Sequence, residues 1–393
     1  MTGFPRVVVT GIGAVTRAGS SLDELWALLT STEEAPVPEG PVAVDPSPWM
    51  RPRDVRRASL ATRYAVAAAG LAWDQAGLGA AAPDPWRTGV AVGNVYGAPD
   101  LGDSARAALA ADGPSAVSVH LAAQACENAP AAAVAMALGA HGPLSAPGTA
   151  CAAGGHAIGD AVDLIRLGRC DVVVAGAGQG PLDDALAASY HAMRIVSASG
   201  VVRPFDTRRD GSRFSQGGGM VVLESLDHAR ARGATVLAEL AGHANTNDAD
   251  NRMAGSPEPM ARCLTGAVAD AGLAPSDVAA VLAHGTATLV NDRLESEVIA
   301  DAIGTAAPVT SIKRVLGHGV AAAGAWNAVA AVLAIGRGQL PSAGVPVEVD
   351  PDVAARGLDV VSGSARTWEP GPVLSNAFGL GGVNSSLVIR PFR

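Results

Sequence analysis

The sequence is poor in lysine, in aromatic residues and in cysteine. Of its 393 residues, 28 are lysine or arginine, yet Lys313 is the only lysine. Aromatic residues make up 4% and charged residues 17%, while 49% are hydrophobic, which is typical of a folded chain with a large aliphatic core. The formal net charge of −9 disfavours nucleic acid as the main partner.

Other features that the sequence lacks exclude further classes of protein. Its four cysteines are not arranged as Cys-x-x-Cys, which argues against a disulfide framework or a zinc site. The segment MTGFPRVVVTGIGAVT has neither the basic part nor the long apolar run of a signal peptide. No run approaches the roughly 20 uninterrupted apolar residues of a membrane span. We therefore expect a soluble cytoplasmic protein without a bound metal and without membrane contact.

Short apolar runs alternate with helical patterns along the whole chain, which predicts α/β layers around a largely buried sheet. Residues 20–29 are expected to form a helix with Ser20 or Ser21 as its N-cap. Residues 115–140 are apolar almost all round and are predicted to form a helix in the centre of the core. Valine-rich runs bounded by glycine predict strands at 6–15, 88–94, 170–178 and 218–225.

The alternation of strands and helices starts again after residues 223–233. This predicts two similar halves, 1–230 and 231–393, without a flexible linker and with one continuous core. The first half contains Cys151, and the second contains His284 and His318.

Cys151 follows a turn and precedes a helical pattern that begins with small residues, in the segment GTACAAGGHAIGD. The N-terminus of a helix favours thiolate over thiol, and small neighbours would let another chain segment or a substrate approach the sulfur. The alternative is a buried structural cysteine, which is a common fate of a lone cysteine.

His284 and His318 each follow an apolar run and stand beside a glycine, and Lys313 lies five residues before His318. A lone histidine is more often structural than catalytic, and a single lysine could survive by chance in an arginine-rich chain. A cysteine with two histidines fits acyl transfer followed by carbanion chemistry on a thioester. A metal site made of these three residues would be a weak interpretation, because they lie far apart in sequence.

Four motifs in this order resemble the β-ketoacyl-acyl carrier protein synthases of the elongating type and the related polyketide ketosynthases. They are TACAAG, HGTATLVND, KRVLGH and NAFGLGGVN, and the resemblance extends over almost the whole chain. It implies the thiolase fold, in which two halves related by a pseudo-twofold axis form five layers, α-β-α-β-α.

The resemblance also implies roles for individual residues. Cys151 would take an acyl group from a carrier protein, and His284 and His318 would promote decarboxylation of a malonyl-type thioester. Lys313 would organise the neighbouring histidine, and the backbone N–H groups of Cys151 and Leu380 would form the oxyanion hole. The enolate would then attack the acyl-cysteine to give a β-ketoacyl chain.

Three positions depart from the family pattern. Leu380 replaces the usual phenylalanine of a glycine-rich gate loop, which predicts looser control of extender entry or a bulkier acyl group. Asn327 and Gln216 each replace a usual glutamate, so Lys313 could lack its counter-charge, although Glu295 is retained. The predicted gate loop consists of Phe378, Gly379, Leu380, Gly381 and Gly382.

The partner implied by the resemblance is an acyl carrier protein, whose phosphopantetheine arm carries the substrate, so no separate cofactor is expected. Carrier proteins are acidic, so a basic patch is needed for docking. We also expect a homodimer, or a heterodimer with a ketosynthase-like subunit, in which 115–140 contribute to the interface and to a roomy acyl pocket. The predicted docking residues are Arg56, Arg57, Arg63, Arg208 and Arg209.

Two alternatives to decarboxylative condensation remain open at this point. One is a ketosynthase-like acyltransferase or cyclase that acts on a carrier-bound chain without decarboxylation. The other is a non-catalytic partner subunit similar to a chain-length factor. Retention of Cys151, His284 and His318 weighs against the second.

Overall fold

Ten strands form one mixed sheet in the computed structural model, which describes residues 4–79, 82–250, 255–344 and 348–393. Their order is β3-β2-β4-β5-β1-β6-β12-β11-β7-β8. These strands are β1 (Val7–Val15), β2 (Thr88–Gly93), β3 (Leu144–Ser145), β4 (Val172–Gln179), β5 (Gly217–Ser225), β6 (Ala238–Asn247), β7 (Ala280–Leu282), β8 (Val309–Thr310), β11 (Val373–Gly379) and β12 (Val383–Arg390). A separate pair consists of β9 (Gln339–Leu340) and β10 (Arg366–Thr367).

The two halves of the sheet have the same internal order. Numbered along the chain within each half, the strands run 3-2-4-5-1 from the outer edge to the centre in both. The halves join where β1 pairs with β6, through Val8 opposite Glu239 and Val9 opposite Ala238. This repeat is the one expected of the thiolase fold.

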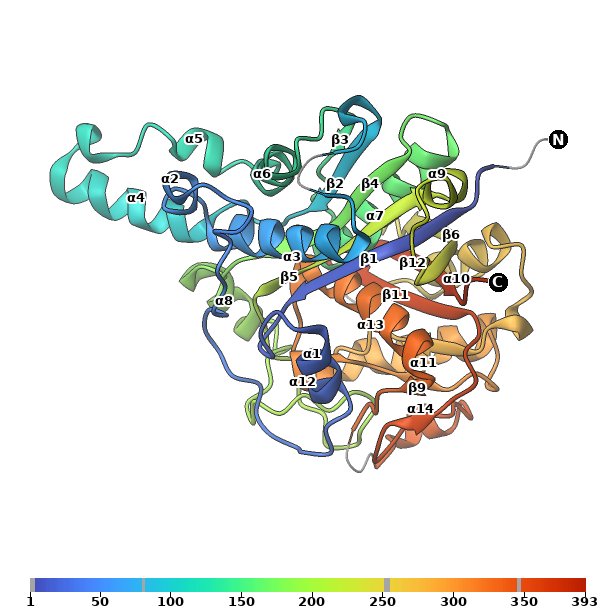
Figure 1. Cartoon of the computed structure of the whole chain (residues 1–393). Coiled ribbons are helices and arrows are strands. Elements are labelled where there is room, and N and C mark those ends of the chain that lie inside the picture. Colours follow the sequence, from blue (N-terminus) through green and yellow to red (C-terminus); the bar gives the residue numbers. More distant parts are fainter. Residues whose placement is uncertain (1–3, 80–81, 251–254, 345–347) are drawn as a thin grey trace.

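The helices form three layers around the two halves of the sheet (Figure 1). Helix α3 packs on β1, β4 and β5 from outside, and α10 packs on β6 and β12 from the opposite side. Helices α7 and α13 pack against each other and against both halves, so they form the central layer. The helices are α1 (Leu22–Leu29), α2 (Pro52–Val55), α3 (Leu60–Ala76), α4 (Pro99–Asp112), α5 (Leu121–Gln124), α6 (Ala129–Leu138), α7 (Ala153–Arg166), α8 (Asp184–Ala192), α9 (Leu226–Ala231), α10 (Pro257–Asp270), α11 (Leu289–Ala302), α12 (Lys313–Leu316), α13 (Ala323–Arg337) and α14 (Pro351–Ala354).

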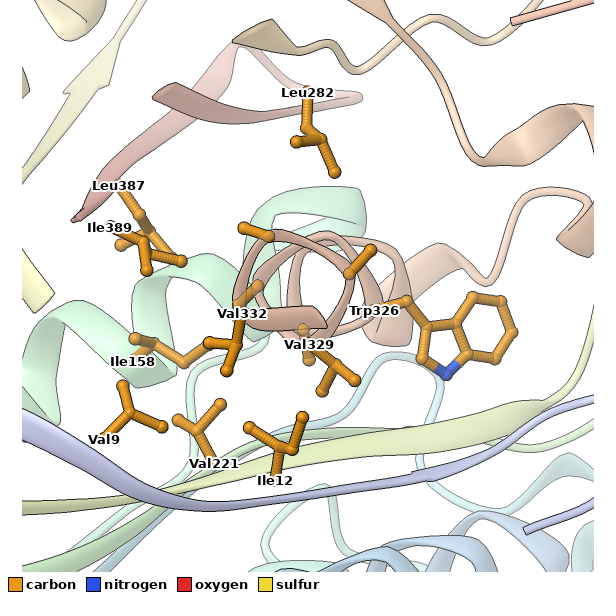
Figure 2. Packing of buried hydrophobic residues seen from close by; sticks show 14 of the residues in the cluster. Val9, Ile12, Ile158, Val221, Leu282, Trp326, Val329, Val332, Leu387 and Ile389 are labelled. Carbon is orange, nitrogen blue, oxygen red and sulfur yellow. The ribbon is translucent and has the colours of Figure 1, made fainter. Parts of the chain in front are cut away.

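The core between the two halves of the sheet surrounds α13. Figure 2 shows Val9 and Val221 from one half of the sheet and Leu387 from the other, with Val329 of α13 between them. These side chains are buried, so both halves share one hydrophobic core. Residues Val320–Arg337 are long and apolar enough for a membrane span, but 89% of this segment is buried inside the fold, as in a core helix.

Several local predictions are confirmed by the structure. Strands β1, β2, β4 and β5 cover the four predicted valine-rich runs. Helix α1 begins after Ser21, whose hydroxyl accepts a hydrogen bond from the backbone N–H of Glu24. The valine-rich runs and the capping residue were sufficient to predict these elements, because both are local sequence signals.

The prediction of one buried helix over 115–140 is wrong. Only α5 and α6 are helical there, together with the end of a short 3₁₀ turn, and most residues of 115–128 are exposed. Pro130 in the first turn of α6 and Asn128 as its N-cap start a new helix there. Figure 1 shows α4 and α5 extending away from the body of the molecule. The apolar composition of this segment therefore does not mean that it lies in the core.

Candidate active site

Cys151 lies in a tight turn that leads into the central helix α7. The turn Ala150–Ala152 is a 3₁₀ helix, and Ala150 has φ of 49°, a left-handed conformation that is uncommon for a residue with a side chain. Cys151 is 6% exposed and lines a cavity of about 480 Å³. The strained turn therefore holds the sulfur at the wall of this cavity.

The small residues after Cys151 let other segments of the chain approach closely, as predicted. Ala152 and Ala153 are fully buried. A side chain at Gly154 would lie 2.8 Å from the carbonyl oxygen of Ala321, and one at Gly155 would lie 2.6 Å from the hydroxyl of Ser385. These positions have to be small because α7 packs closely against the turn before α13 and against β12.

Burial of the Cys151 sulfur opposes the thiolate form that its position at the start of a helix is predicted to favour. Burial raises the pKa of Cys151 to about 11, against the charge of Lys313 and the backbone N–H groups of Leu380 and Cys151 itself. Those N–H groups nevertheless lie within hydrogen-bonding range of the sulfur. They are the two groups that the resemblance assigns to an oxyanion hole.

The rings of His284 and His318 lie next to each other in the cavity wall, with centroids 5.2 Å apart and planes at 82°. The backbone N–H of Val320 donates to Nδ1 of His318 at 3.2 Å, and the ammonium of Lys313 lies 3.4 Å from Nδ1 of His284. Because Nδ1 accepts in both rings, Nε2 carries the proton in both. Burial and the charge of Lys313 lower the pKa of each histidine well below its ordinary value, so both rings are neutral N–H donors.

Lys313 contacts His284 from inside the protein and is 2% exposed. Its Nζ donates to the carbonyl oxygen of His284 at 2.5 Å. The buried carboxylate of Glu295 accepts the backbone N–H groups of His284 and Gly285, each at 2.7 Å. Burial lowers the pKa of Lys313 and raises that of Glu295, while the attraction between the two opposes both shifts.

The structure shows what Asn327 and Gln216 contact and which carboxylate interacts with Lys313. Asn327 donates to the backbone carbonyls of Ala283 and Asn376, at 3.3 and 3.1 Å, and Gln216 lies within hydrogen-bonding range of the Tyr64 hydroxyl. Lys313 therefore keeps Glu295 as an electrostatic partner without a glutamate at position 327.

Part of the predicted gate loop lines the same cavity as Cys151. It spans the end of β11 and the turn before β12, and Leu380 is half-buried in the cavity wall. The ring of Phe378 packs edge-on against His284, with centroids 5.7 Å apart. The carbonyl of Gly382 accepts the N–H of Asp248 at 2.8 Å, which ties the loop to the segment after β6.

The cavity lining is apolar with scattered hydroxyl groups. Side chains of Met193, Met260 and Phe214 supply apolar surface, and Thr286 and Thr288 supply hydroxyls. Among the described residues, none of 115–140 lines the cavity in this single chain. Their contribution to a dimer interface and acyl pocket stays a prediction. The described residues also contain no group of three or more His, Cys, Asp or Glu placed to hold a metal ion.

The predicted docking arginines differ in accessibility. Arg56 and Arg57 are exposed, whereas the guanidinium of Arg63 donates to the carbonyl of Ala58. Arg208 is partly exposed and pairs with Asp206 at 2.8 Å. The prediction that Arg209 takes part in docking is wrong.

The Arg209 side chain is 2% exposed and pairs with Asp350 at 2.7 Å. Its guanidinium also donates to the carbonyls of Thr288 and Leu289, so it stabilises the start of α11 and is not available to a partner.

Arg194 is a cavity residue that sequence reasoning missed. It is exposed at the cavity wall with φ of 56°, and no hydrogen bond or ion pair joins its side chain to another described residue. No periodicity or motif marks it, because only the folded chain brings the end of α8 to the cavity.

The fold and this site define a class of proteins: thiolase-fold ketosynthases with a cysteine and two histidines at one cavity. The family model of the β-ketoacyl synthase N-terminal domain matches residues 39–229, and that of the C-terminal domain matches residues 237–344. The chain therefore belongs to the β-ketoacyl synthase family.

Curated relatives match along nearly the whole chain. Nodulation protein E of Rhizobium sp. (strain N33) is 35% identical, with 98% of this chain and 99% of the relative covered. The 3-oxoacyl-[acyl-carrier-protein] synthase 2 of Rhizobium meliloti (strain 1021) is 33% identical over the same shares.

Solved structures agree with this assignment. The ishigamide ketosynthase/chain length factor is 31% identical with a TM-score of 0.92, and 100% of each chain is covered. The complex AntDE:AntF, described as a type II PKS acyl-carrier protein with its ketosynthase bound to the hexaketide, has a TM-score of 0.86 and 29% identity, covering 99% of this chain and 100% of the other. The chain is thus a ketosynthase of the kind found in type II polyketide and fatty acid synthesis.

Proposed function

We propose that the protein catalyses decarboxylative Claisen condensation of an acyl group on Cys151 with malonyl-acyl carrier protein. The observation that carries the proposal is the convergence of Cys151, the N–H of Leu380 and the rings of His284 and His318 on one cavity. Each of these groups has a task in the two half-reactions.

In the first half-reaction, the sulfur of Cys151 attacks the thioester carbonyl of the acyl-carrier substrate. A new sulfur–carbon bond forms, the bond to the carrier sulfur breaks, and the proton of Cys151 leaves with the carrier thiol. Negative charge develops on the carbonyl oxygen, and the N–H groups of Leu380 and Cys151 can stabilise it.

In the second half-reaction, the malonyl carbon–carbon bond breaks and carbon dioxide leaves. The electron pair passes into an enolate, whose oxygen accepts from the Nε2–H groups of His284 and His318. The enolate carbon attacks the acyl carbonyl, the bond to the Cys151 sulfur breaks, and the sulfur takes up a proton from water. Neutral histidines suit this task because a donor is needed before the charge develops.

Lys313 and Glu295 act as positioning residues in this scheme. Lys313 fixes the ring of His284 through Nδ1 and the carbonyl oxygen, while Glu295 fixes the backbone on the other side. Their opposite charges offset each other in a buried place where either charge alone would be costly.

The test uses intact mass and released carbon dioxide. The wild-type protein is expected to gain the mass of a short acyl group from an acyl carrier protein, and Cys151→Ala is not. Malonyl carrier protein should then release the acyl group as a β-keto product with one carbon dioxide per turnover. Acylation without carbon dioxide release would instead favour an acyltransferase or cyclase, and no acylation would favour a non-catalytic partner subunit.

Carrier docking is tested separately. We expect Arg56→Glu/Arg57→Glu to raise the apparent KM for acyl carrier protein about tenfold at low salt, because an acidic partner would meet like charge. Rates with a small thioester that lacks the carrier should be unchanged. An unaltered KM would remove these two arginines from the docking surface.

A further inference from the structure

Phe214 lines a second, smaller cavity besides the active-site cavity. This side cavity has a volume of about 150 Å³. Leu182 and Val196 add apolar surface to it, and Arg213 and Glu39 supply charged groups. Its wall therefore combines an apolar surface with a guanidinium group.

Arg213 already holds a carboxylate of the protein itself. Nη2 of Arg213 lies 2.8 Å from Oε1 of Glu39, and the Glu39 side chain is 65% exposed, against 22% for that of Arg213. Glu39 belongs to residues 31–46, which form no helix or strand, and it is the only carboxylate among the described residues that line the side cavity. An exposed ion pair of this kind adds little stability, so the carboxylate of a ligand can replace Glu39 at small cost.

Gln216 offers a second hydrogen-bond donor at the same cavity. The oxygen of its amide lies 3.5 Å from the Tyr64 hydroxyl, while its N–H₂ group has no hydrogen-bond partner among the described residues. Gln216 is partly exposed and lines the side cavity. An oxygen atom of a ligand in the cavity would accept a hydrogen bond from this group.

The segment that carries Arg213 and Phe214 also holds His318. The carbonyl of Arg213 accepts the N–H of His318 at 2.6 Å, and the N–H of Ser215 donates to the carbonyl of His318 at 2.9 Å. The rings of Phe214 and His318 are stacked, with centroids 5.8 Å apart. A ligand in the side cavity would therefore contact residues that position a histidine of the active site.

We propose that the side cavity binds a short, free carboxylic acid. Its carboxylate replaces that of Glu39 on the guanidinium of Arg213, and its hydrocarbon chain packs against Phe214 and the apolar residues beside it. An inorganic anion would leave the apolar surface uncovered, and an uncharged alcohol would leave Glu39 in place. This inference goes beyond the proposed function, because it requires no acylation of Cys151.

The test is a titration of the purified protein with hexanoate at low salt, followed by the NMR signals of the ligand. Acetate and hexanol are the comparison probes. Each should bind at least about tenfold more weakly than hexanoate, because acetate lacks four methylene groups and hexanol lacks the charge.

Two variants should change the affinity for hexanoate in opposite directions. Arg213→Gln removes the cation and should weaken binding about tenfold or more, since a hydrogen bond between charged groups is lost. Glu39→Gln removes the competing carboxylate and should strengthen binding about two- to fivefold, as expected for the loss of an exposed ion pair. Glu34→Gln is the matched control, because Glu34 pairs with Arg203 at 2.9 Å outside both cavities, and it should leave the affinity unchanged.

The inference is overturned if hexanoate does not bind the wild type. It is also overturned if both Arg213→Gln and Glu39→Gln bind hexanoate as the wild type does, since the acid then lies in the active-site cavity. If Arg213→Gln does not fold, Glu39→Gln decides, because an unchanged affinity there contradicts the displacement of its carboxylate. Binding is measured without catalysis, so this result does not depend on whether the protein carries out the proposed condensation.

Discussion

The two halves of the molecule share one backbone device and use it for different chemistry. In the first half, left-handed Ala150 opens the turn Ala150–Ala152 before α7. In the second half, left-handed Val320, with φ of 45°, opens the turn Val320–Ala322 before α13. Both turns follow equivalent strands in the same internal order, and the central helices pack against each other.

The side chains carried by the two turns differ. The second residue of the first turn is Cys151, whereas its counterpart in the second turn is Ala321, which is fully buried. His318 lies just before the second turn and faces the same cavity as Cys151. One repeat thus supplies the nucleophile and the other supplies the two histidine rings, so a duplicated scaffold can bring two chemistries to one cavity.

The largest effect is expected from moving the thiol from the first turn to the second, which tests whether the two turns are equivalent in acylation. In a Cys151→Ala/Ala321→Cys variant we expect no acyl-enzyme at all. Ala321 is held by a hydrogen bond from its N–H to Gln179 at 3.3 Å and does not line the cavity. Intact mass with peptide mapping checks this, and acylation at position 321 would mean that the two turns are interchangeable.

Removing either histidine should affect the decarboxylation step, which depends on the second half of the molecule, much more than acylation of Cys151 in the first half. His284→Ala and His318→Ala should lower malonyl decarboxylation about 10²- to 10⁴-fold, because each removes a positioned proton donor. Self-acylation of Cys151 should survive within about tenfold, since the oxyanion hole is intact. Carbon dioxide release and acyl-enzyme formation are measured on the same preparations. Equal losses in both assays would contradict the division of labour between the halves.

The buried histidines also predict how stability depends on pH. Their pKa values are lowered in the folded state, so below about pH 6.5 the unfolded chain binds protons that the folded chain does not. The contribution of each histidine to stability should fall as the pH decreases, by up to about 1.4 kcal/mol per pH unit, whereas Glu295, whose pKa is raised to about 7, contributes in the opposite direction.

Urea unfolding of His318→Asn at several pH values checks this prediction. The slope below pH 6.5 should become shallower than in the wild type. His141→Asn, at an exposed histidine outside the site, is the matched control. An unchanged slope in His318→Asn would mean that this ring is protonated in the folded protein.

Much of the site could be predicted from sequence because its residues lie in short, ordered motifs. Cys151, His284 and His318 line one cavity, and Lys313 lies beneath it. The pKa of Cys151 could not be predicted, because it depends on burial by distant segments such as the loop at Leu380.

The fold could be predicted where the sequence signal is local. The prediction failed where burial depends on tertiary contacts. Strands β2 and β4 follow from valine runs between glycines. The exposure of 115–128 and the burial of Arg209 do not, since apolar composition does not say which neighbour covers a segment. Likewise, the pairing of Arg213 with Glu39 is visible only in the folded chain.

The smallest expected effect tests the shared left-handed conformation itself. Replacing Ala150 by glycine removes about 1 kcal/mol of strain and costs about 0.5–1 kcal/mol of chain entropy, so stability should hardly change. Val320 is 1% exposed, and losing its buried side chain costs about 1.5–3 kcal/mol, so Val320→Gly should be destabilised even after strain relief. Ala152→Gly, at a right-handed residue of the first turn, is the control and should lose about 0.5–1 kcal/mol. Urea unfolding midpoints rank the three variants. If Ala150→Gly were as destabilised as Ala152→Gly, the first turn would store no strain, and the backbone likeness of the two halves would carry no energetic cost.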